Sequence, residues 1–69
     1  MDLAARIVNY KGGRPTPVII LGFRVMQSVV TVFYMNKATG DLQWADVGQD
    51  GFIIDPDGTV TERVFRLGE

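Results

Sequence analysis

The segment that decides the fold runs from Val18 to Met35 and reads VIILGFRVMQSVVTVFYM. It has the length of a minimal membrane-spanning helix, but Arg24 near its middle would cost about 2.5–3.5 kcal/mol to place in a bilayer. Gln27 and Ser28 add to that cost, and the many Val, Ile, Phe and Tyr residues prefer strands to helices. The segment therefore predicts two adjacent buried strands, Val18–Met26 and Val29–Met35.

The two predicted strands differ in how their apolar residues are distributed. Val18–Met26 places Gly22 and Arg24 on one face, and Gly22 predicts a bulge or a sharp bend. The other face is apolar and comprises Ile19, Leu21, Phe23 and Val25. Val29–Met35 is apolar on both faces, and a strand of that kind is central in a sheet or lies in an interface.

Turn signals divide the rest of the chain at short intervals. Turns are predicted at Lys11–Pro17, Asn36–Asp41, Gly48–Gly51 and Asp55–Gly58. Gly40 is placed to take a positive φ, and Asp55–Gly58 has the Pro and Gly positions of a type I turn. Further strands are predicted at Arg6–Tyr10, Asp41–Val47, Phe52–Ile54 and Thr59–Leu67. Met1–Ala5 is expected to be a short helical turn or a frayed lead-in.

The chain of 69 residues makes one small domain, and its five or six short strands in one meander predict an all-β fold. The bend expected at Gly22 favours a small SH3-like barrel or a strongly bent antiparallel meander. Cysteine and histidine are absent, which excludes disulfides, thiolate nucleophiles and the common zinc sites. Domains of this size usually need a disulfide, a metal or a partner chain for stability. Self-association is therefore expected.

Catalytic arrangements find no support in the sequence. Without Cys or His, Ser-His-Asp and Cys-His arrangements are impossible within one chain. Ser28 is the only serine and lacks a Gly-x-Ser-x-Gly context, and Gly12-Gly13 is followed by Arg14-Pro15 instead of a helix start. We expect no enzymatic activity and no cofactor. The N-terminal residues lack the pattern of a secretory signal, so a cytoplasmic protein is expected.

Several short motifs follow one another along the chain, namely Tyr10-Lys11-Gly12-Gly13, Val18-Ile19-Ile20-Leu21-Gly22, Val32-Phe33-Tyr34, Leu42-Gln43-Trp44 and Phe52. Together they resemble a family of small bacterial SH3-like domains of unknown function. The likeness spans roughly residues 10–65, and it implies an SH3-like fold without implying an activity. The chain departs from the family after Trp44, where Ala45-Asp46-Val47 stands in place of Val-Arg-Pro.

An acidic segment contains five aspartates within 17 residues, namely Asp41, Asp46, Asp50, Asp55 and Asp57. The stretch from Asp46 to Asp57 has the length of an EF-hand Ca²⁺ loop. It carries Gly48 where an Asp or Asn ligand is needed, and Asp57 where a bidentate Glu is needed. Turn-forming aspartates are the favoured interpretation. A small-ligand or Ca²⁺ binder at Asp46–Asp57 is one alternative function.

The charges divide unevenly along the chain. Residues 1–37 carry five basic residues and one acidic residue, whereas residues 38–69 carry two basic and seven acidic residues. Pairing between the two halves would cancel these charges, or they would meet a complementary partner. A single-stranded nucleic-acid-binding barrel is another alternative function, with phosphate contacts from Lys11, Arg14 and Arg24 and stacking on Tyr10 and Phe23. The pI of about 5.2 argues against nucleic acid as a partner.

The aromatic residues suggest a binding cage as well as a core. SH3-like relatives hold methylated cations or proline-rich peptides on aromatic side chains, and the residues available here are Tyr10, Tyr34, Trp44 and Phe52. In so small a domain most aromatics are expected in the core. Trp44 is the candidate exception to this expectation, because it shares a strand face with Leu42, opposite to Gln43 and Ala45.

The function that the sequence favours is a non-enzymatic protein-binding or assembly module, such as a small bacterial or phage accessory protein. It is expected to form a homodimer through Val29–Met35, because that strand is apolar on both faces. The predicted partner-binding residues are Tyr34, Trp44, Phe52, Lys11, Arg14 and Arg24.

Overall fold

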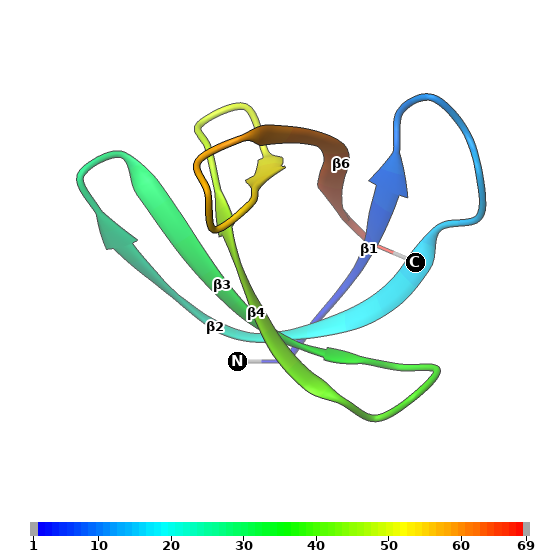
Figure 1. Ribbon diagram of the computed structural model, residues 1–69. Helices are drawn as coiled ribbons and strands as arrows, with labels where there is room; N and C mark the ends of the chain where they lie inside the picture. The colour runs from blue at the N-terminus through cyan, green and yellow to red at the C-terminus, as the bar shows by residue number, and fades with distance from the viewer. Residues whose placement is uncertain (1, 69) are drawn as a thin grey trace.

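Six antiparallel strands close into a small barrel in the computed structural model, which describes residues 2–68 (Figure 1). The strands are β1 (Leu3–Asn9), β2 (Thr16–Met26), β3 (Val29–Asn36), β4 (Leu42–Val47), β5 (Phe52–Ile54) and β6 (Val60–Leu67). Each strand pairs with the next along the chain, and β6 returns to pair with β1. The all-β prediction is confirmed, and the architecture fits a small SH3-like barrel. None of the described residues belongs to a helix that could cross a membrane.

The strand β2 bends around the barrel (Figure 1), and its pairing with β3 contains a bulge. Its register on β3 shifts between Ile20 and Gly22, which confirms the irregularity predicted at Gly22. Before the bulge, Ile20 points into the core; after it, Phe23 takes the same side as its inward-facing partner Val32.

One consequence of the bulge corrects the predicted faces of β2. Ile19, Leu21, Phe23 and Val25 were expected on one face, and that prediction is wrong. Side chains along a strand alternate between the two faces, and the extra residue at the bulge shifts this alternation by one position. Ile19 therefore lies outside, while Phe23 and Val25 lie on the side of the core. Gly22 and Arg24 do share a face, and it is the outer one.

The core consists mainly of small aliphatic side chains. Its buried apolar residues are Ala5, Ile7, Val18, Ile20, Val32, Tyr34, Val47, Ile53 and Val64. The expectation that most aromatics pack in the core is wrong: of the seven aromatic residues, Tyr34 is buried, Phe52 and Phe65 are partly buried, and Tyr10, Phe23, Phe33 and Trp44 are exposed. The interior of a barrel of so few short strands is narrow, and Val and Ile already fill it.

The expectation for the residues before Arg6 is also corrected. Leu3–Ala5 was predicted to be helical or frayed, but these residues belong to β1. Ala5 is 2% exposed and pairs with Val18 on one side and Leu67 on the other. Two neighbouring strands therefore hold a segment that has no strong propensity of its own, and Met1 lies outside the described residues.

The turns follow the predicted turn chemistry. Gly40 has a φ of 80°, and the Gly58 N–H donates to the Asp55 carbonyl at 2.8 Å, which closes the turn around Pro56. The β2–β3 hairpin is different, because its two turn residues Gln27 and Ser28 have φ of 49° and 70°. Positive φ at both positions defines a type I′ turn, for which Asn-Gly is the preferred pair.

The hairpin turn therefore offers a stabilising substitution. Replacing Gln27 by Asn and Ser28 by Gly should relieve the left-handed strain and stabilise the fold by about 1 kcal/mol, which raises Tm by roughly 4–8 °C. Thermal denaturation followed by circular dichroism measures the change. Ser28→Ala, which keeps a Cβ at positive φ, is the control and should give no gain. An Asn-Gly variant that melts no higher than the wild type would contradict the strain argument.

Candidate functional site

The outer face of β2, β3 and β4 carries large apolar side chains in solvent. The strand registers align it in three rows across the sheet, which are Ile19–Met35–Leu42, Gly22–Phe33–Trp44 and Arg24–Thr31–Asp46. Phe33 is 42% exposed, Trp44 61% and Leu42 73%. We call Ile19, Leu21, Phe33, Met35, Leu42 and Trp44 the apolar face.

The surface of the apolar face is uneven. A shallow groove of about 260 Å³ lies between Leu21, Phe33, Leu42 and Trp44. Gly22 lies beside Phe33 and has no side chain. No atom lies within 4 Å of the place where a Cβ would be, so the surface of the sheet is uncovered at this position. The face thus presents a bulky indole at one end of its middle row and an empty position at the other.

The third row borders the apolar face with opposite charges. Thr31 Oγ1 donates a hydrogen bond to Asp46 Oδ1 at 2.8 Å. Arg24 lies on the other side of Thr31 and is exposed, and it makes no ion pair with any residue between 2 and 68. This row therefore carries a positive charge on β2 and a negative charge on β4.

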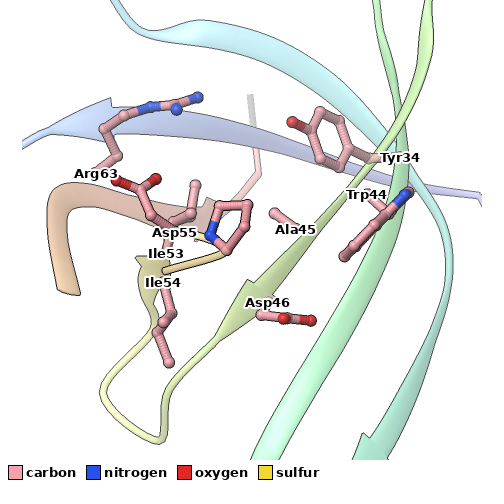
Figure 2. A pocket seen from close by; sticks show the side chains of 9 residues that line it. Tyr34, Trp44, Ala45, Asp46, Ile53, Ile54, Asp55 and Arg63 are labelled. Atoms are coloured by element: carbon pink, nitrogen blue, oxygen red, sulfur yellow. The ribbon is translucent and has the colours of Figure 1, made fainter. Parts of the chain in front are cut away.

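A second cavity, of about 220 Å³, opens at the mouth of the barrel between β4 and the β5–β6 turn (Figure 2). Tyr34 and Trp44 lie on one side of it, Asp55 and Arg63 lie on the other, and Pro56 also lines it. We call it the mouth pocket. Its volume is below the roughly 300–1,000 Å³ of typical small-molecule sites, so it can take a single side chain.

The mouth pocket exists because the pairing of β4 with β5 stops early. The two strands pair only at Asp46–Ile54 and Val47–Ile53. If the pairing continued in the same register, Pro56 would lie opposite Trp44. Proline has no backbone N–H to donate to the neighbouring strand. The chain turns away there and leaves Trp44 at an open stretch of sheet edge.

The structure places the predicted aromatic residues in two separate depressions. Tyr34 and Trp44 line the mouth pocket. Tyr10 and Phe52 pack edge to face at a centroid distance of 5.7 Å, in another depression beside Glu62. The four residues therefore do not form one cage. Tyr34 also packs edge to face on Phe65, with the ring centroids 5.5 Å apart, and this contact helps to fix its ring beside the mouth pocket.

The predicted cations do not form one patch. Lys11 Nζ lies 2.9 Å from Glu62 Oε1, an ion pair that joins the basic and acidic halves of the chain. Arg14 lies in the β1–β2 loop, where it lines a depression with Arg6 and Lys37. Arg24 lies towards the β2–β3 hairpin, on the opposite side of the molecule from the β1–β2 loop (Figure 1).

Two groups in these sites were missed at the level of sequence. In the sequence, Asp46 is one aspartate of the acidic segment, and its place in one row with Arg24 follows only from the strand registers. Arg63 reaches the mouth pocket from the irregular part of β6, where the register with β5 shifts. The alternation that puts Leu42 and Trp44 on one strand face is a sequence signal for the apolar face, because that strand face is the outer one.

Asp50 and Asp57 of the acidic segment stabilise turns, whereas Asp46 lies within β4. Asp50 Oδ1 accepts the Phe52 N–H at 3.2 Å, and Asp57 Oδ1 accepts the Thr59 N–H at 2.9 Å, as expected of turn-forming aspartates. Among residues 2–68, no group of three His, Cys, Asp or Glu side chains is arranged to hold a metal ion. Hydrogen bonds from Thr59 lower the pKa of Asp57 from its ordinary value of 3.8.

The lowered pKa makes the β5–β6 turn sensitive to acid. The carboxylate form of Asp57 is favoured in the folded state, so its contribution is complete above about pH 4 and is lost as the pH falls through the lowered pKa. Asp57→Ala should lower Tm at neutral pH by a few degrees, and the difference from the wild type should shrink below pH 4. Thermal melts between pH 2.5 and 7 test this. A pH-independent difference would contradict it, and Asp55→Ala is the control within the same turn.

Comparison of the chain with protein-family models, curated proteins and solved structures finds no match. The functional proposal therefore rests on the residues and their geometry.

Proposed function

We propose that the protein is a non-catalytic assembly module that self-associates through the apolar face. The observation that carries the proposal is the exposure of Phe33, Leu42 and Trp44 side by side on one sheet face. Contiguous exposed apolar surface on a small protein commonly marks an interaction site. Phe33 and Met35 belong to Val29–Met35, the strand that the sequence predicts as the interface.

The size of the core supports self-association over an isolated domain. Among residues 2–68 the barrel buries nine apolar residues, most of them Val or Ile. Full burial of one further Phe or Leu side chain contributes roughly 1.5–3 kcal/mol. Covering the apolar face would thus add a substantial fraction to the free energy of unfolding, which is typically only 5–15 kcal/mol for a whole domain.

The alternative functions have weaker support. Nucleic-acid binding through Lys11, Arg14 and Arg24 would need these cations close together, but one is ion-paired and the other two lie on opposite sides of the molecule. A Ca²⁺ or small-ligand site at Asp46–Asp57 would need side chains that converge. Asp50 and Asp57 instead hold backbone N–H groups of their own turns.

Replacing one exposed phenylalanine tests the proposal. Phe33→Gln should weaken self-association at least ten-fold and leave the fold intact, because the side chain points outward from the central strand. Sedimentation equilibrium at increasing protein concentrations measures the association constant. Thermal melts at the same concentrations should show a Tm that rises with concentration for the wild type.

The chain contains a matched control for this substitution. Phe23 is 56% exposed but lies past the bulge, off the apolar face, so Phe23→Gln should leave the association constant within about two-fold. A wild type that is monomeric at all concentrations would refute self-association. Equal effects of the two substitutions would show that the apolar face is not the interface.

A further inference from the structure

We infer that the two copies pair about a two-fold axis running along β3, so that β2 of each copy lies over β4 of the other. This inference rests on the proposed self-association and defines its geometry. In closed homodimers the same surface patch meets itself, so each residue contact occurs twice. In the dimer, the apolar face of one copy must therefore cover the apolar face of the other. The charged row Arg24–Thr31–Asp46 must at the same time meet opposite charges on the rotated copy.

The charged row selects this axis. Rotation about a line parallel to β3 keeps the order of the rows and exchanges the places of β2 and β4. Arg24 of one copy then faces Asp46 of the partner subunit, and its own Asp46 faces Arg24 of the partner subunit. The Asp46 carboxylate points away from Asp55 (Figure 2), and only its Oδ1 accepts a hydrogen bond from Thr31.

The other in-plane axis, across the strands, fits poorly. It would reverse the order of the rows and set Arg24 and Asp46 against the apolar row of Ile19, Met35 and Leu42. Both charges would then lose water without gaining an opposite charge, which is strongly unfavourable. The electrostatics of the border thus discriminate between two packings that bury the same apolar residues.

The shape of the middle row agrees with the axis along β3. Trp44 of each copy would lie over Gly22 of the other, where the sheet is open and an indole can fill the roughly 10 Å between packed sheets. Phe33 lies on the axis and would meet Phe33 of the partner subunit. Three strands and three rows cover only roughly 14 by 20 Å, so we expect a weak dimer with a dissociation constant of about 10 μM or higher.

Charge reversal with mixing tests this geometry. Arg24→Asp and Asp46→Arg should each weaken homodimer formation at least ten-fold, because each places two like-charged contacts in the interface. An equimolar mixture of the two variants should form a heterodimer within about three-fold of the wild-type affinity. In the mixed pair, both contacts again join opposite charges. The chain that carries both substitutions should recover the homodimer for the same reason.

The measurement is sedimentation equilibrium up to about millimolar protein at low salt, with circular dichroism to verify that each variant is folded. Arg14→Asp, which reverses an exposed cation on the distant β1–β2 loop, is the control and should leave dimerisation unchanged within about two-fold. A mixture that associates no better than its components, beside a wild type that still dimerises, would overturn the axis and leave self-association standing. A monomeric wild type would overturn both.

Discussion

The bulge between Ile20 and Gly22 is the constraint on which the rest of the structure depends. It lets the single long strand β2 pair with β1 over its first half, bend, and continue along β3 to the hairpin. It also sets which side chains face inward. Without the extra residue, the side of Val18 and Ile20 would continue through Gly22 to Arg24, and an unpaired guanidinium would face the core. The bulge thus accompanies the bend of β2 and keeps Arg24 on the outer face.

Barrel closure also explains why the apolar surface is divided between inside and outside. The narrow interior is filled by Val, Ile and one Tyr, and no space remains for Phe33 or Trp44. Those side chains lie directly opposite one another on adjacent strands, so their exposure gives one continuous face. The narrow closed barrel thus folds around a small core and leaves large apolar side chains outside. A second copy of the chain can cover these side chains.

The candidate site residues show which neighbours a sequence pattern can predict and which it cannot. The shared face of Leu42 and Trp44 follows from simple alternation, and the structure confirms it. Lys11, Arg14 and Arg24 fall within 14 residues of sequence, yet the length and bend of β2 separate Arg24 from the other two. Arg24 and Asp46 are far apart in sequence and lie in one row, because β3 brings their strands to either side of Thr31.

The sequence by itself determined the order of strands and turns and the all-β class, because these depend on local chemistry. Pro56, Gly58 and Gly40 end or turn the chain through their own backbone preferences, and the β-branched segments between turns extend. Only the tertiary structure decided which apolar face is buried and which charges share a row. Alternation divides a strand into two faces, but a bulge resets their phase, and strand register across the closed barrel assigns each residue its neighbours.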